Sequence, residues 1–149
     1  MALTIAGSDP SGGAGIQADL ATFGALEVLG LSVVTALTVQ SPRGVRAVHA
    51  LAPELVLAQL DCLLADLPGG SLGALKLGML ADAEIVRAVG RRLAADDVRA
   101  LPVVLDPVLQ ATRGADLLGA GGLQALKHTL LPRVDVLTPN LDEADILRG

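Results

Sequence analysis

The sequence has almost no aromatic residues: Phe23 is the single one, and Trp and Tyr are both missing. Basic residues are also few, with 11 Lys and Arg against 16 Asp and Glu, which gives a net charge of −5. Binding to nucleic acid usually requires phosphate-neutralising charge and aromatic stacking platforms. The composition therefore argues against a nucleic-acid partner.

Cysteine is nearly absent as well. The single Cys62 excludes an internal disulfide and a thiolate metal site, and its leucine neighbours predict a thiol buried in the core. No apolar run approaches the roughly 20 residues that cross a bilayer, and the N-terminus lacks the basic region of a secretory signal. We therefore expect a cytoplasmic protein with no membrane contact.

Apolar residues, in contrast, are abundant. They make up 52% of the 149 residues, which is enough to bury a substantial core and excludes a disordered chain. The length suits one ordinary domain and is too short for two. We therefore treat residues 1–149 as part of a single domain.

Short runs rich in apolar residues alternate with longer segments of helical periodicity. Strands are predicted over 2–6, 31–40, 74–77, 102–105 and 134–137, with a short ribbon over 45–50. Helices are predicted over 15–28, from Pro53, after Asp82 as the N-cap, over 123–131 and from about Asn140. Strands separated by helices of this length imply βαβ crossovers, and so an α/β fold with a mainly parallel sheet flanked by helices.

Small or polar residues follow each of the five predicted strands. In chain order they are Gly7, Gln40, Gly78, Asp106 and Asn140. Parallel strands share one direction, so these exits should lie along one edge of the sheet, where open parallel sheets bind their ligands. The arrangement predicts a binding cleft, although turn chemistry alone places such residues at many strand ends.

A glycine-rich turn over residues 8–15 follows the first strand. It is not a Walker loop, because no Gly-Lys-Ser/Thr follows, and its glycine spacing misses the dinucleotide fingerprint. It is either a flexible turn or backbone that approaches a small ligand above a helix N-terminus. Asp19, in the next helix, either gains from the helix dipole or accepts a hydrogen bond from a ligand.

Other side chains have similar double interpretations. Gln40 offers a donor and an acceptor, which suits a flat heteroaromatic edge, and Met79 is either an apolar wall or a core residue. Asn140 and Glu143 fit a helix N-cap with a capping box. The same residues would suit a Mg²⁺–phosphate site, because Mg²⁺ is usually held by one or two carboxylates with phosphate oxygens and waters.

Residues 3–20, LTIAGSDPSGGAGIQADL, resemble the N-terminal signature of hydroxymethylpyrimidine/phosphomethylpyrimidine kinases, which are ribokinase-like enzymes of thiamine biosynthesis. The match is long and has no gap. Further segments of the family follow in order, at 35–40, 43–45, 76–80, 104–108 and 137–144. The resemblance covers essentially the whole chain and implies the N-terminal part of one ribokinase-like kinase domain.

The resemblance also implies a substrate and its contacts. ATP would phosphorylate the hydroxymethyl group of 4-amino-5-hydroxymethyl-2-methylpyrimidine and then the resulting monophosphate. Asp19 and Gln40 match positions that hydrogen-bond the aminopyrimidine. The wall of the pocket would comprise Gly7, Ala14, Met79 and Val108. Pyridoxal-type kinases are the nearest alternative, because they share the fold and a heteroaromatic alcohol substrate.

The expected nucleotide and metal residues follow from the same resemblance. Asn140 and Glu143 match the N-x-x-E motif that organises Mg²⁺ and phosphate in ribokinase-like enzymes, and Asp106 lies where a carboxylate near the metal is expected. We therefore expect ATP near Thr138 and Asn140, and Mg²⁺ near Asp106 and Glu143.

One departure from the family pattern concerns catalysis. Family members continue to a Gly-Thr-Gly-Cys or Gly-x-Gly-Asp segment that supplies the anion hole and, in many members, the catalytic group, and nothing in this sequence matches it. We therefore expect a fold truncated on its C-terminal side, catalytic residues beyond Gly149 and little turnover by the chain alone. A non-catalytic pyrimidine-binding relic is the alternative. The oligomeric state stays open, with a homodimer as one alternative.

Overall fold

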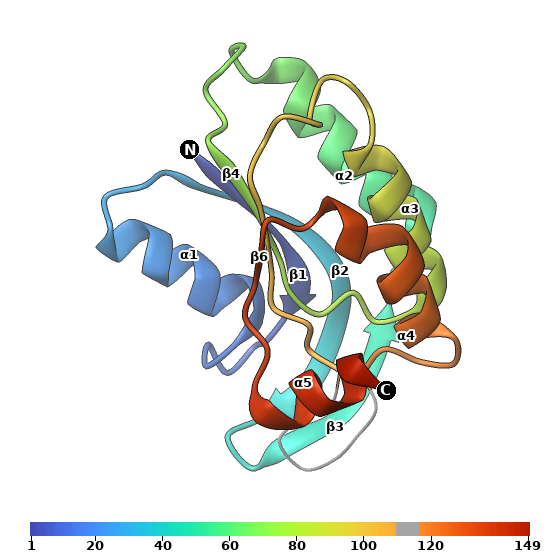
Figure 1. Cartoon of the computed structure of the whole chain (residues 1–149). Coiled ribbons are helices and arrows are strands. Elements are labelled where there is room, and N and C mark those ends of the chain that lie inside the picture. The colour runs from blue at the N-terminus through green and yellow to red at the C-terminus, as the bar shows by residue number, and fades with distance from the viewer. Residues whose placement is uncertain (110–116) are drawn as a thin grey trace.

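The computed structural model describes residues 1–109 and 117–149, in which six strands form one sheet (Figure 1). The strand order is β3-β2-β1-β4-β5-β6. The strands are β1 (Ala2–Ser8), β2 (Gly30–Ser41), β3 (Gly44–Ala50), β4 (Ala74–Leu77), β5 (Val103–Leu105) and β6 (Val136–Leu137). Neighbouring strands are parallel except β2 and β3, which form an antiparallel ribbon. The predicted mainly parallel α/β sheet is confirmed.

Helices cover both faces of this sheet. They are α1 (Gly15–Ala25), α2 (Pro53–Asp66), α3 (Ala83–Leu93), α4 (Gly122–Ala125) and α5 (Leu141–Arg148). Helix α4 continues into a π-helical turn, Leu126–Leu130, and a 3₁₀ turn, Leu131–Arg133. Figure 1 shows α1 on one side of the sheet and α2, α3 and α4 on the other.

Side chains along the central strands β1 and β4 alternate between the apolar core on one face of the sheet and the polar site on the other. Leu3 and Ile5 of β1 and Leu75 and Leu77 of β4 are fully or almost fully buried in the main apolar cluster, which includes the inner faces of α2 and α3. Successive side chains of a strand point to opposite faces. The intervening Thr4, like Lys76 of β4, therefore faces the side on which α1 packs, and this side carries the polar residues described below.

Helix α3 begins at the predicted N-cap. The Asp82 carboxylate accepts hydrogen bonds from the backbone N–H groups of Glu84 at 2.9 Å and Ile85 at 2.8 Å. These bonds satisfy two of the four N–H groups that a helix start leaves without partners. The cap thus fixes the start of a helix in which seven of eleven residues are buried.

We expect Asp82→Ala to lower the free energy of unfolding by about 1 kcal/mol, the usual cost of losing a side-chain cap. Urea unfolding followed by circular dichroism measures this. Glu84→Ala is the matched control, because it removes an exposed charge from the same turn without touching the cap. Equal losses in the two variants would show that charge, and not capping, is responsible.

Two local expectations were wrong. Helix α1 ends at Ala25 rather than at residue 28, because Glu27 has φ 58°, in the left-handed region where a right-handed helix cannot continue. Cys62 is exposed. The buried residues of α2 are Val56 and Leu60, and a position two residues after Leu60 is turned about 200° around the helix, away from the core.

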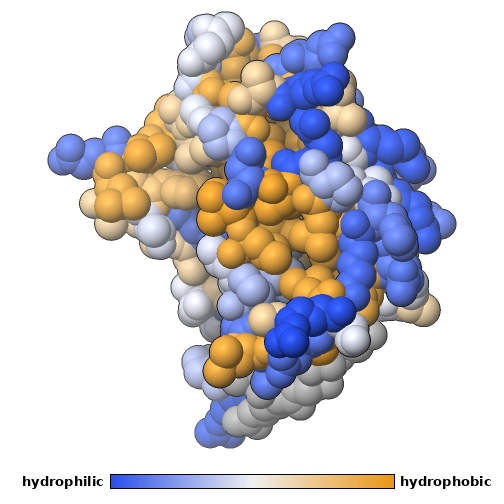
Figure 2. Space-filling model, viewed as in Figure 1, coloured by the Kyte–Doolittle hydropathy of each residue, from blue (hydrophilic) through white to orange (hydrophobic). Residues whose placement is uncertain are grey.

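Apolar side chains also gather on the surface. Figure 2 shows them in the middle of the viewed face, where Figure 1 places β6. Val136 and Leu137 of β6 are 50% and 38% exposed. Within residues 1–109 and 117–149, no helix is long and apolar enough to cross a membrane.

Candidate functional site

A cavity of about 340 Å³ lies at the carboxyl ends of the parallel strands. Its walls come from the turn after β1, the first turns of α1, the end of β2, strand β4 and its exit, and the segment after β5. All six predicted substrate residues line it: Gly7, Ala14, Asp19, Gln40, Met79 and Val108. Asp106 lines it too. The structure thus brings these residues together, and their contact with a pyrimidine stays a prediction.

The glycine-rich turn lets the chain enter α1 directly beside β1. Gly15 has φ 58°, and a Cβ atom there would collide with the carbonyl oxygen of Gly7. A Cβ atom on Gly7 would in turn collide with the terminal methyl group of Met79. Gly15 is therefore needed for the close approach of two backbone segments, whereas the flexible end of Met79 could move aside for a side chain at position 7.

Asp9 holds this turn from inside, and the sequence did not single it out. Its carboxylate accepts hydrogen bonds from the backbone N–H and hydroxyl of Ser11, both at 2.7 Å, and from the N–H of Gly13 at 3.1 Å. The residue is only 4% exposed. Burial raises the pKa of the Asp9 carboxyl, but hydrogen bonds, led by those from Ser11, outweigh it and hold the pKa below the usual value.

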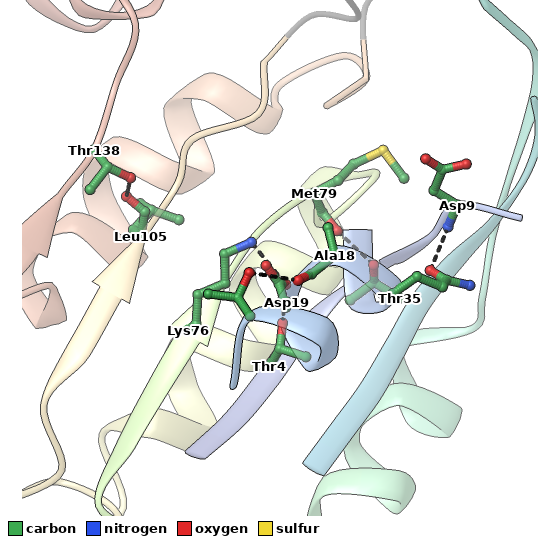
Figure 3. Close-up of polar contacts among 11 residues, drawn as sticks. Thr4, Asp9, Ala18, Asp19, Thr35, Lys76, Met79, Leu105 and Thr138 are labelled. Carbon is green, nitrogen blue, oxygen red and sulfur yellow. Dashed lines mark hydrogen bonds and ion pairs between the residues drawn. The ribbon is translucent and has the colours of Figure 1, made fainter. Parts of the chain in front are cut away.

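Asp19 points from α1 to two donors on neighbouring strands. Figure 3 shows Thr4 and Lys76 converging on its carboxylate. The Thr4 hydroxyl donates to Oδ2 at 2.6 Å, and the Lys76 ammonium donates to the same oxygen at 3.0 Å. The Asp19 and Lys76 side chains are 16% and 21% exposed. These contacts fix the carboxylate in the wall of the cavity.

Lys76 and Thr4 were missed as site residues. A signal for Lys76 was present, because a lysine between Leu75 and Leu77 in a buried strand needs a partner for its charge. No comparable signal marked Thr4, since threonine is common in strands.

Two further contacts shape the cavity. The Thr38 hydroxyl of β2 donates to the carbonyl of Ser8 at 3.0 Å, tying the end of β2 to the glycine-rich turn. Near the same end of β2, the antiparallel pairing with β3 is irregular, because its register shifts between Val39 and Gln40. The Thr35 hydroxyl donates to the carbonyl of Met79 at 2.6 Å (Figure 3), which holds the exit of β4 against β2.

The residues predicted for nucleotide, Thr138 and Asn140, do not line the cavity. Asn140 caps α5, its Oδ1 accepting from the Glu143 N–H at 2.9 Å, while Glu143 Oε2 accepts from the Asn140 N–H at 3.0 Å. The predicted capping box is therefore confirmed. Thr138 is exposed, and its hydroxyl lies 3.4 Å from the carbonyl of Leu105 (Figure 3).

The Asp106 carboxyl lies within electrostatic reach of Lys76, Glu143 and Asp19. Burial raises the pKa of the Asp106 carboxyl, the charge of Lys76 lowers it, and the carboxylates of Glu143 and Asp19 raise it again. No three His, Cys, Asp or Glu side chains of the described residues form a metal-holding group. Mg²⁺ usually takes one or two protein carboxylates, with phosphate and water as its remaining ligands, and its binding by Asp106 and Glu143 stays a prediction.

The family model described as phosphomethylpyrimidine kinase matches residues 9–149. The chain belongs to this family. It is 50% identical to the hydroxymethylpyrimidine/phosphomethylpyrimidine kinase of Salmonella typhimurium over 146 residues, which are 98% of this chain and 53% of that protein. The Bacillus subtilis kinase of the same name is 45% identical over 148 residues, 99% of this chain and 53% of the relative. The chain thus spans about half the length of these curated relatives.

Solved structures confirm the ribokinase-like fold expected for a member of the family. The phosphomethylpyrimidine kinase of Clostridium difficile superposes with a TM-score of 0.87 at 39% identity, over 99% of this chain and 62% of that one. A pyridoxal kinase of Staphylococcus aureus, in complex with AMP-PCP and pyridoxal, superposes with a TM-score of 0.78 at 36% identity, over 98% of this chain and 50% of that one. Both structures superpose on nearly the whole of this chain.

Proposed function

We propose that this chain provides the substrate-binding part of a hydroxymethylpyrimidine/phosphomethylpyrimidine kinase. The reaction would use ATP to phosphorylate the hydroxymethyl group of 4-amino-5-hydroxymethyl-2-methylpyrimidine and then the monophosphate, as a step towards thiamine diphosphate. The observation that carries this proposal is the convergence of all six family-matched substrate residues on one cavity. Family membership over residues 9–149 supports it.

The cavity has the chemistry that a substituted aminopyrimidine requires. Met79 and Val108 offer apolar surface to a ring, while Asp19 and Gln40 offer polar atoms for its edge. A volume of about 340 Å³ lies at the small end of the range for ligand pockets. A single heteroaromatic ring with short substituents is a ligand of suitable size.

ATP and Mg²⁺ are the cofactors of this proposal. An ADP complex and an AMP-PCP complex of a related pyridoxal kinase support nucleotide binding. Thr138 and Asn140 would contact the nucleotide, and Asp106 and Glu143 would hold Mg²⁺, which neutralises phosphate charge in phosphoryl transfer. A cytoplasmic location and a homodimer stay predictions.

Pyridoxal is the second candidate substrate, favoured by one observation. Pyridoxal kinases superpose on this chain almost as well as phosphomethylpyrimidine kinases do, with TM-scores of about 0.8. The preference of the chain for hydroxymethylpyrimidine or pyridoxal therefore has to be measured.

The test is calorimetric titration of the chain with hydroxymethylpyrimidine and, separately, with pyridoxal. We expect tighter binding of the aminopyrimidine. Binding of pyridoxal alone would favour the second candidate, and binding of neither ring would contradict both. A chimera in which residues 1–149 replace the matching half of the Salmonella typhimurium kinase adds a catalytic readout, and we expect it to consume ATP when hydroxymethylpyrimidine is supplied.

A further inference from the structure

Lys76 is the one basic side chain that lines the cavity, as far as residues 1–109 and 117–149 show. The acidic side chains that line it are Asp9, Asp19 and Asp106. An anionic ligand group entering this cavity would thus meet mostly negative charge. Among the described residues of the wall, Lys76 is the single positive side chain that could balance it.

The ammonium group of Lys76 has donors to spare. It carries three N–H groups, and its ion pair with Asp19 Oδ2 accounts for one of them. The Thr4 hydroxyl donates to the same oxygen. Asp19 therefore keeps a hydrogen-bonded partner even without the lysine, so holding Asp19 does not by itself require a cation.

The position of the ammonium group suits contact with the reacting end of the substrate. It donates a hydrogen bond to Asp19, which we expect to bind the ring. Its charge also acts on Asp106, which we expect to lie near the metal. Gly78 leaves room for it, because a Cβ atom there would lie 2.8 Å from Nζ. Lys76 thus stands between the predicted ring-binding and phosphate-binding parts of the site.

We propose that Lys76 binds the exocyclic oxygen of the substrate, first the hydroxyl group and then the phosphate of the monophosphate. The inference rests on the proposed function and deepens it, since it assigns a residue to recognition of the second substrate. Ammonium–phosphate hydrogen bonds are charge-assisted and strong, and phosphoryl transfer depends on such cations. The competing explanation is that Lys76 only positions Asp19.

The two explanations predict different ligand dependence. Calorimetry without nucleotide or Mg²⁺ would compare the monophosphate with the same aminopyrimidine carrying a plain methyl group at position 5. We expect Lys76→Met to weaken monophosphate binding about tenfold more than binding of the methyl compound. The matched control is Thr4→Val, which removes the other partner of Asp19 but keeps the cation. It should weaken both ligands by similar factors.

Lys76→Arg should retain most of the preference for the monophosphate, and Lys76→Gln, a second neutral variant, should lose it as Lys76→Met does. Equal losses for both ligands in the neutral variants would overturn the assignment and leave Lys76 a positioning residue. If the wild-type chain binds the monophosphate but not the methyl compound, loss of monophosphate binding in Lys76→Met but not in Thr4→Val would support the inference. Wild-type chain that binds neither compound would instead refute the proposed function, and the inference with it.

Discussion

Replacing Gly15 with alanine is expected to lower the free energy of unfolding by about 2–5 kcal/mol. Two costs combine, since a left-handed backbone costs a residue with a side chain roughly 1–2 kcal/mol and an enforced packing shift costs about 1–3 kcal/mol. Gly15 has φ 58°, and its added Cβ would meet the Gly7 carbonyl oxygen, a backbone atom that cannot turn aside. Urea unfolding of the purified variant measures the loss.

Gly12 supplies the matched control for this prediction. It also has positive φ, 79°, but a Cβ atom there would meet nothing within 4 Å. Gly12→Ala should therefore show only the conformational cost of roughly 1–2 kcal/mol. If the Gly15 variant were no less stable than the Gly12 variant, the contact between the turn and β1 would not matter for stability.

Gln40→Leu is expected to weaken binding of hydroxymethylpyrimidine by roughly fivefold to 150-fold. Leucine has similar bulk but no polar atoms, so a ligand group that pairs with the amide would be buried without a partner, at a cost of about 1–3 kcal/mol. Gln40 lines the cavity at the end of β2, where the Thr38–Ser8 hydrogen bond fixes the strand to the glycine-rich turn. Calorimetric titration of wild-type and variant chains measures the change.

Gln124→Leu is the control, because Gln124 is exposed and lies outside the cavity. Unchanged affinity in the Gln40 variant would remove Gln40 from the site. A loss for hydroxymethylpyrimidine with none for pyridoxal would assign the amide to the amino edge of the pyrimidine.

The sheet and its binding edge could be predicted because their causes are local. Apolar runs bounded by turn residues predicted β4 over 74–77, and the structure has it at Ala74–Leu77. Asp82 and Asn140 were predicted as N-caps from residue type and spacing, and both cap helices. Because parallel strands have their carboxyl ends at the same edge of a sheet, the residues after the strands had to lie along that edge. Gly7 and Gln40 could therefore be predicted to lie close together.

What the sequence did not reveal depends on orientation around helices and on contacts between distant segments. Cys62 has apolar neighbours in the sequence, yet it lies on the outer side of α2. The contact of Lys76 with Asp19 joins residues 57 positions apart, and the Thr4 hydroxyl completes it from a third element. Asp9 satisfies its carboxylate inside its own turn, so its burial could not be inferred from hydrophobic periodicity.

The chain separates the cavity wall from the capping box of α5. Residues that line the cavity come from Ala6 to Gln40 and from Lys76 to Val108, with Leu117, whereas the capping box occupies Asn140 and Glu143. Mutations that reshape the wall around the ring can therefore accumulate without disturbing that helix start. Under selection, such a layout allows a duplicated gene to change the cavity residues while the helix start at Asn140, predicted to contact nucleotide, is inherited intact.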